Sequence, residues 1–225
     1  MLFAIPDLLT AEQVAQIQES LSRTEFKDGR PTAGLGSRGV KNNLQVTWDD
    51  ASQNEIRKLV LQALERNQAF QFLALPQKIL PPTFNRYESG MYYGDHVDHS
   101  ILGKQINMPI RSDISTTIFL SDPSAYDGGE LVITRDGLEH TIKLPAGQAI
   151  VYSATCLHRV NAVTRGARIA AVTSAQSMIK DETQRDVLGE LAKVTRWVQD
   201  TAPDAQETVM LGKIYANLIR MWAEI

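Results

Sequence analysis

The fold class is decided by one stretch of sequence, Leu131-Val-Ile-Thr-Arg-Asp-Gly-Leu-Glu-His-Thr-Ile-Lys-Leu-Pro-Ala-Gly-Gln-Ala-Ile-Val-Tyr152. Short apolar or β-branched runs alternate in it with turn residues, a pattern typical of sandwiches and barrels, including double-sheet jelly rolls. The runs are 131–134, 141–144 and 149–152, and the turns are Asp136-Gly and Pro145-Ala-Gly. Similar runs at 116–120 and 169–172 extend the pattern, so we expect a β-core over about residues 78–177.

Helices are expected on both sides of this β-core. Thr10 is a suitable N-cap, and Val14, Ile17 and Leu21 then share one helical face. A second helix is expected from about Ser52 to Gln68, which makes residues 1–75 mostly helical. Two apolar stripes in residues 179–225 predict a helical hairpin, packed on the β-core or on a second subunit. The predicted class is therefore α+β, with a domain over residues 1–178 followed by this hairpin.

Composition excludes several classes of protein. The chain has 225 residues and a net charge of −3, which argues against nucleic-acid binding through a broad basic face. Its one cysteine, Cys156, allows no intrachain disulfide and suits a reducing cytoplasm. We expect no signal peptide, because the short apolar N-terminus lacks a basic region and soon meets Asp7 and Glu12. We also expect no membrane helix, because no apolar run approaches about 18 residues. With four histidines, any metal site must combine few imidazoles with carboxylates.

The pair His96-Val-Asp98 is the first candidate for such a metal site. Residues i and i+2 of a strand point to the same face, so both side chains can reach one ion. An imidazole and a carboxylate suit Fe(II), Mn(II) or Zn(II). Taken alone, the pair is more often a structural or surface feature, because chance gives such pairs frequently in a chain of this composition.

His158 and Arg168 complete the candidate site. Two histidines and one carboxylate form the facial triad of non-haem Fe(II) oxygenases. Residues 162–166 are expected to form a hairpin turn, which points His158 and Arg168 inward if its loop is odd in length. A guanidinium there can bind a carboxylate bidentately. The alternatives are a satisfied core histidine and a solvated charge on a strand.

The flanking sequence adds a resemblance to a known family. The set His96-x-Asp98, His158 and Arg168 resembles the site of the Fe(II)/2-oxoglutarate-dependent dioxygenases. A first set of flanking segments resembles the prolyl 4-hydroxylase-like branch, and a second set resembles the bacterial PKHD-type hydroxylases. The resemblance to the PKHD-type hydroxylases covers nearly the whole chain. The first set is Arg86–Asp98, Ser115–Asp122 and Gly128-Gly-Glu-Leu131, and the second is Val40-Lys-Asn-Asn-Leu44 and Leu157–Gly166.

This resemblance implies a double-stranded β-helix core and a role for each matching residue. His96, Asp98 and His158 match the iron ligands, and Arg168 matches the residue that binds the distal carboxylate of 2-oxoglutarate. Tyr87 falls near the expected cosubstrate site. Phe119 stands where some relatives carry a tyrosine that helps bind that carboxylate, so Arg168 needs a different partner here.

The same resemblance implies the reaction and its cofactors. Fe(II), 2-oxoglutarate as cosubstrate and O₂ are expected, with ascorbate as a further requirement. The substrate, a small molecule or a peptide, is hydroxylated while 2-oxoglutarate is decarboxylated to succinate and CO₂. Self-association through the C-terminal helices is a further expectation. The sequence leaves the substrate unidentified.

Other features have simpler interpretations. Gly34-Leu-Gly-Ser-Arg-Gly39 matches a dinucleotide fingerprint in letters only, and we interpret it as a loop, with a lid over the substrate as a hypothesis. His99 and His140 are expected to be ordinary residues, and Cys156 a small buried apolar one. Two other functions stay open at this point. One is a non-catalytic iron and 2-oxoglutarate sensor acting through the C-terminal helices, and the other is a zinc hydrolase.

Overall fold

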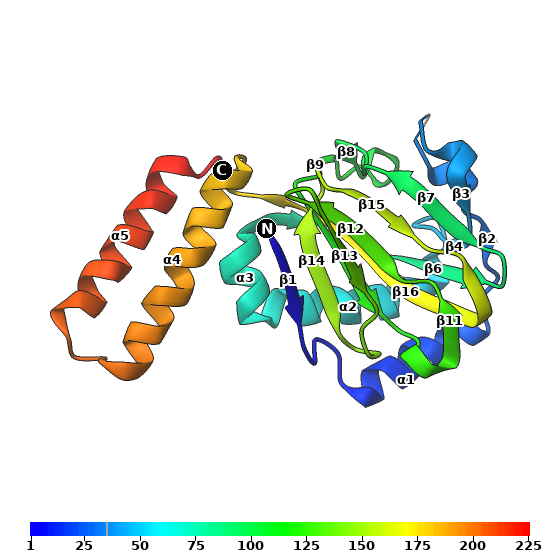
Figure 1. Cartoon of the computed structure of the whole chain (residues 1–225), viewed down its shortest axis with the longest axis horizontal. Coiled ribbons are helices and arrows are strands. Elements are labelled where there is room, and N and C mark those ends of the chain that lie inside the picture. Colours follow the sequence, from blue (N-terminus) through cyan, green and yellow to red (C-terminus); the bar gives the residue numbers. More distant parts are fainter. Residues whose placement is uncertain (35) are drawn as a thin grey trace.

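A larger and a smaller antiparallel sheet face each other in the computed structural model, which describes residues 1–34 and 36–225 (Figure 1). In spatial order, the larger sheet contains β1 (Leu2–Ile5), β14 (Ala149–Ser153), β10 (Ile114–Phe119), β16 (Val163–Ser177), β6 (Thr83–Glu88), β4 (Leu44–Val46) and β2 (Lys27–Asp28). β5 (Pro76–Ile79) and β11 (Tyr126–Gly128) also pair with β16. The smaller sheet contains β13 (Leu138–Ile142), β12 (Leu131–Arg135), β15 (Leu157–Val160), β7 (Tyr92–His96) and β3 (Lys41–Asn42), while β8 (Ile101–Leu102) pairs with β9 (Ile110–Arg111). The predicted α+β jelly roll is confirmed.

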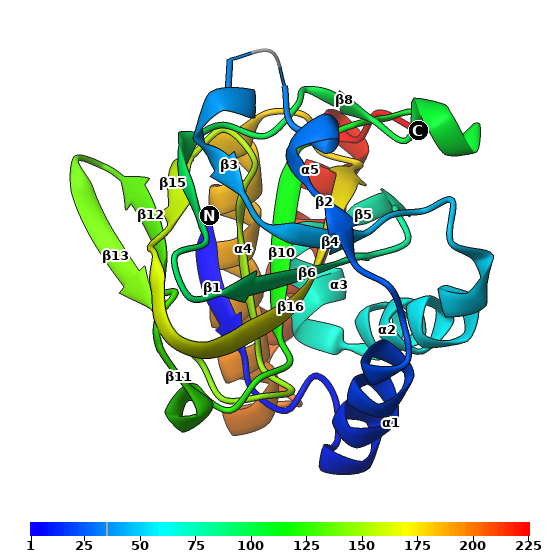
Figure 2. The same ribbon diagram turned by 90° about the vertical axis from the view of Figure 1, so that its right-hand side faces the viewer.

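Three helices, α1 (Ala11–Ser22), α2 (Asn54–Arg66) and α3 (Gln68–Ala74), cover the larger sheet on the side away from the smaller one (Figure 2). α1 begins where predicted, because Thr10 and Gln13 form a capping box. The predicted second helix is divided at Asn67, whose side chain caps α3 by accepting a hydrogen bond from the amide of Phe70 at 2.9 Å. These helices bury their apolar stripes on the sheet.

Strand β10 shows how the larger sheet separates its two faces. Ile114 and Ile118 pack in the core under the helices, and Phe119 packs between the sheets. Ser115 and Thr117, on the same face as Phe119, are buried hydroxyls that face the interior of the sandwich. The inner face of the sandwich therefore offers polar groups as well as an apolar wall.

The N-terminal third is less helical than the sequence suggests. Residues 1–75 were expected to be mostly helical, yet they also form β1, β2, β3 and β4. β1 adds to the larger sheet by pairing Phe3 with Val151. These strands have two to four residues each, too few to show an alternating pattern, so backbone pairing with distant strands defines them.

The expectation of a hairpin turn at residues 162–166 is wrong. β15 belongs to the smaller sheet and β16 to the larger, so the chain crosses between the sheets there. Gly128 allows this crossing to pack closely, because a Cβ on it would lie 2.1 Å from the carbonyl oxygen of Ala162, and its φ is +70°. His158 and Arg168 nevertheless line the same interior cavity, one from each sheet.

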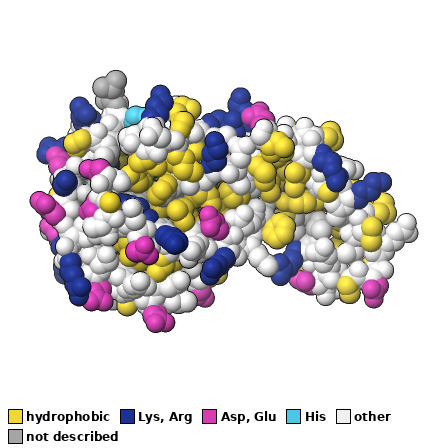
Figure 3. Space-filling model, turned by 180° about the vertical axis from the view of Figure 1, so that it is seen from behind, with side chains coloured by type: hydrophobic (Ala, Val, Ile, Leu, Met, Phe, Trp, Pro, Cys, Tyr) yellow, Lys and Arg dark blue, Asp and Glu magenta, His cyan; other side chains and the backbone are white. Residues whose placement is uncertain are grey.

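The helices α4 (Glu182–Thr201) and α5 (Gln206–Trp222) form the predicted C-terminal hairpin, which stands beside the sandwich (Figure 1). Leu188 of α4 is buried with Leu75 and Ile179, and apolar residues of α5 pack against this cluster. Hydrophobic side chains also lie on the surface of the hairpin (Figure 3). They include Val194, Trp197, Val209 and Met221. Across the described chain, no helix has the length and apolar character needed to span a membrane.

Candidate functional site

A cavity of about 550 Å³ lies between the two sheets and contains every predicted site residue. Its wall includes His96, Asp98, His158 and Arg168, so the structure brings together side chains from β7, β15 and β16 and the segment after β7. Further residues on the wall come from β3, β4, β6, β10 and β14. Among these are Lys41, Gln45, Asn85, Tyr87, Thr117 and Tyr152.

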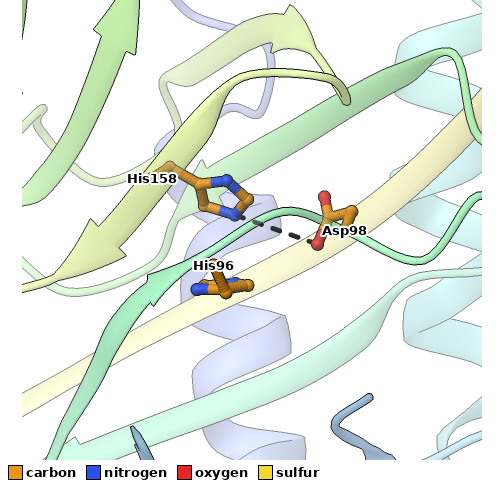
Figure 4. Close-up of side chains that lie close together, drawn as sticks. All are labelled: His96, Asp98 and His158. Carbon is orange, nitrogen blue, oxygen red and sulfur yellow. Dashed lines mark ion pairs between the residues drawn. The ribbon is translucent and has the colours of Figure 1, made fainter. Parts of the chain in front are cut away.

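His96, Asp98 and His158 form a compact cluster (Figure 4). His96 and His158 are cross-strand partners, with ring centroids 4.2 Å apart. Nε2 of His158 lies 3.8 Å from Oδ1 of Asp98. One ligand atom from each residue lies within 4.8 Å of the others. β7 ends at His96, so Asp98 reaches the cluster from just beyond the strand and not from a regular strand position.

Backbone carbonyls fix which nitrogen of each imidazole faces the cluster. Nδ1 of His96 lies 2.8 Å from the carbonyl oxygen of Gly94, and Nδ1 of His158 lies 3.0 Å from that of Cys156. Since a carbonyl only accepts, each Nδ1 carries a hydrogen, and in a neutral imidazole this leaves Nε2 with the lone pair that can bind a metal. The pKa of His96 lies below its usual value, chiefly because the ring is buried and secondly because His158 lies beside it. Two neutral imidazoles and a carboxylate are the donor set that Fe(II) takes in facial triads.

Ser115 on β10 donates a hydrogen bond to Oδ2 of Asp98. This bond holds the carboxylate with Oδ1 towards His158. Groups that orient a metal ligand typically contribute 10- to 100-fold to metal affinity. We therefore expect Ser115→Ala to weaken metal binding by about tenfold, measured by titration with Mn(II). The matched control is Ser121→Ala, because Ser121 is also buried but donates its hydrogen bond to the carbonyl oxygen of Ala167. An unchanged metal affinity in Ser115→Ala would contradict this role.

Arg168 is a buried cation that forms no ion pair with any of the residues that the structure describes. Its side chain is 2% exposed, and its guanidinium carbon lies 5.3 Å from the ring centroids of both Tyr87 and Phe119. In the described part of the chain, its Nε and Nη2 are buried and have no hydrogen-bond partner. Such groups are costly to bury unless a ligand satisfies them. The arrangement suits a carboxylate that enters from the cavity.

Tyr126 lies beside Arg168, although it is not among the described residues that line the cavity, and it was not singled out from the sequence. Its hydroxyl is buried and, among the described residues, has no hydrogen-bond partner. Tyr126 and Arg168 both pack against Gly129, since a Cβ there would lie 3.1 Å from both Cδ of Arg168 and Cε2 of Tyr126. Burial raises the pKa of Tyr126, and the charge of Arg168 opposes this. The Tyr126-Asp-Gly-Gly129 motif was available as a signal, but only the fold shows that this hydroxyl lies beside Arg168.

The remaining predicted residues fall in varied places. His140 is exposed on β13, and Cys156 is buried in the apolar cluster between the sheets, both as expected. His99 is exposed but lines the cavity, where Nε2 lies 2.6 Å from the place a Cβ on Gly34 would take. Leu35 lies outside the described residues, so the lid hypothesis for residues 34–39 stays a prediction. From that loop, Ser37 accepts a hydrogen bond from Tyr93 at 3.1 Å.

A jelly roll with two histidines and a carboxylate around one position defines the class of non-haem Fe(II) oxygenases. The comparisons with known proteins agree. Residues 82–174 match the family model of the 2OG-Fe(II) oxygenase superfamily, and residues 182–224 match the PKHD-type hydroxylase C-terminal domain.

Relatives match over the full length of the chain. A PKHD-type hydroxylase of Paracoccus denitrificans is 46% identical over 226 residues, covering 100% of both chains. One from Gluconacetobacter diazotrophicus is 43% identical over 99% of both. The crystal structure of a Pseudomonas putida prolyl-4-hydroxylase is similar in fold, with a TM-score of 0.54 at 19% identity over 78% of this chain and 92% of that one. The chain belongs to the PKHD-type hydroxylase family. It is an Fe(II)- and 2-oxoglutarate-dependent hydroxylase.

Proposed function

We propose that His96, Asp98 and His158 hold the Fe(II) of this hydroxylase, and that Arg168 binds the distal carboxylate of 2-oxoglutarate. One observation carries the proposal: the three ligand atoms face the same cavity as a buried guanidinium whose Nε and Nη2 have no partner among the described residues. Tyr126 is proposed to supply the hydroxyl that Phe119 lacks, since its own hydroxyl is buried beside Arg168. The cavity volume suits 2-oxoglutarate together with a small molecule or a peptide side chain.

The residues of the chain position the reactants. When bound, Fe(II) and 2-oxoglutarate activate O₂ for hydroxylation of the substrate, yielding succinate and CO₂. Arg168 fixes the orientation of 2-oxoglutarate by holding its far end. Leu131 and Val160 form an apolar part of the cavity wall and exclude water from the reacting groups. Ser115 keeps the Asp98 carboxylate turned towards the two histidines.

Succinate formation tests the proposed function. Purified protein with Fe(II), 2-oxoglutarate, O₂ and ascorbate is expected to produce succinate above a protein-free control, measured by mass spectrometry, and more of it when a substrate is present. A sensor would bind 2-oxoglutarate without turnover, and a zinc hydrolase would act with Zn(II) and without 2-oxoglutarate. Either outcome would refute the proposal. Ascorbate is expected to prolong turnover, as the family resemblance implies.

We also propose that the two parts of the chain have different roles. Every residue that lines the cavity lies between Thr32 and Ser174, which supports a catalytic unit over residues 1–178. The hairpin of residues 179–225 is proposed to mediate self-association, because apolar side chains such as Trp197 and Val209 are exposed on it. A cytoplasmic location is proposed from the single free cysteine, Cys156.

A further inference from the structure

Lys41 is a charged residue of the cavity that the proposed function does not use. It lies on β3 opposite Tyr93 of β7, is 7% exposed, and lines the cavity with the metal cluster. Nζ of Lys41 lies 5.0 Å from the ring centroid of Tyr93. That ring in turn stacks on His96, with centroids 3.5 Å apart. The ammonium and the candidate iron ligand therefore share one aromatic neighbour.

Neutral groups are the hydrogen-bond partners of this ammonium. Nζ donates to Oγ1 of Thr32 at 2.8 Å and to Oε1 of Gln45 at 3.3 Å. No ion pair links Lys41 to a carboxylate in the residues that the structure describes. Burial lowers the pKa of Lys41 to about 8, although the charges of Asp98 and Asp28 oppose this. A buried ammonium with neutral partners is costly for the free protein, and a bound anion would offset that cost.

The other charges of the cavity balance without Lys41. Fe(II), the Asp98 carboxylate, the two carboxylates of 2-oxoglutarate and the Arg168 guanidinium together carry no net charge when both histidines are neutral. The remaining acidic residue on the described wall, Asp49, is exposed and accepts a hydrogen bond from Thr47. The loaded cavity therefore keeps one buried positive charge, at Lys41, for the primary substrate.

We propose that Lys41 binds a carboxylate of the primary substrate, so that this hydroxylase acts on small molecules or peptides that present a carboxylate. Thr32 and Gln45 hold the ammonium in place. One ammonium with neutral partners matches a single negative charge, whereas phosphate sites typically combine several cationic or backbone donors. The inference rests on the proposed function for the position of the metal and of 2-oxoglutarate.

Matched pairs of acids and amides test this inference. Protein loaded with Mn(II) and 2-oxoglutarate is mixed with N-acetyl amino acids or with the corresponding N-acetyl amino acid amides. Paramagnetic Mn(II) broadens the NMR signals of a probe bound in the cavity, so the readout does not require turnover. We expect the acids to bind about tenfold or more tightly than the amides, because a hydrogen bond between two charged groups is stronger than one to a neutral amide.

Variants of Lys41 assign the preference to this residue. Lys41→Met is expected to remove the preference for acids, and Lys41→Arg to retain part of it. The affinity for 2-oxoglutarate is expected to change little in Lys41→Met, since Arg168 holds that ligand. Equal broadening by acids and amides in the wild type would overturn the inference. The same holds if Lys41→Met keeps the preference or loses 2-oxoglutarate binding.

Stability separates this role from a structural one. If Lys41 serves only to brace Thr32 and Gln45, Lys41→Met will lower the unfolding temperature of the metal-free protein. If Lys41 instead serves to bind an anion, removal of its charge leaves the unfolding temperature of the metal-free protein unchanged or raises it. A clear decrease would count against the inference. Acid-selective binding without any succinate formation would refute the proposed function and leave the binding role intact, so the two failures are distinguishable.

Discussion

Arg168→Met will weaken 2-oxoglutarate binding by about 100-fold or more and leave metal affinity nearly unchanged. Methionine keeps much of the volume between Tyr87 and Phe119 but removes the guanidinium. The distal carboxylate of 2-oxoglutarate would then be buried without a counter-charge, which costs about 3–5 kcal/mol. Calorimetric titration of Mn(II)-loaded protein with 2-oxoglutarate measures the effect, and a separate Mn(II) titration measures metal affinity.

Two further variants sharpen this experiment. Arg165 lies on the same strand as Arg168, but it is exposed and pairs with Asp127. The control variant Arg165→Met should therefore leave the affinity for 2-oxoglutarate unchanged. Tyr126→Phe should cost about tenfold, because it removes one hydrogen bond to a charged group. If Arg168→Met weakens metal and 2-oxoglutarate binding equally, Arg168 is structural and the assignment is wrong.

Asp98→Ala will weaken Fe(II) binding by about 100-fold or more and thereby abolish succinate formation. The variant removes the negative ligand of the cluster, and the two neutral imidazoles then face a divalent cation alone. Since even groups that only orient a ligand contribute 10- to 100-fold, loss of the ligand is expected to cost about 100-fold or more. Metal content after dialysis and an Mn(II) titration provide the measurement.

A histidine outside the site provides the matched control. His140→Ala changes an exposed residue on β13 and should bind metal like the wild type. His96→Ala and His158→Ala should behave like Asp98→Ala, because all three contribute to one cluster. Wild-type metal content in any of the three variants would show that the residue concerned is not a ligand.

Local sequence signals predicted the elements that local interactions control. Thr10 caps α1 because the capping box lies within four residues. Asp136 and Gly137 turn β12 into β13 with φ of 53° and 78°, the left-handed pair that such two-residue hairpins need. That His96, Asp98, His158 and Arg168 lie around one cavity was also predictable, since motif order and flanking sequence agreed with a known family.

Features that depend on distant contacts were not predictable in this way. A turn signal before β16 cannot show whether the next strand returns to the same sheet, and at residues 162–166 it does not. Similarly, Lys41 lies in a polar stretch that gives no sign of burial. It becomes buried because β3 pairs with β7, and that pairing joins residues 41 and 93. Tyr126 was missed for the same reason.

Strand β16 has a consequence for how the chain folds during synthesis. This 15-residue strand pairs with β5, β6, β10 and β11, all of which precede it in the chain. Ala175, for example, pairs with Ile79 on one side and Ile114 on the other. The larger sheet therefore cannot close until residues 163–177 leave the ribosome, and non-local pairing of this kind is slow. Until then, the edges of β6 and β10 are exposed to aggregation, and chaperone binding to the nascent chain is expected to end once β16 has emerged.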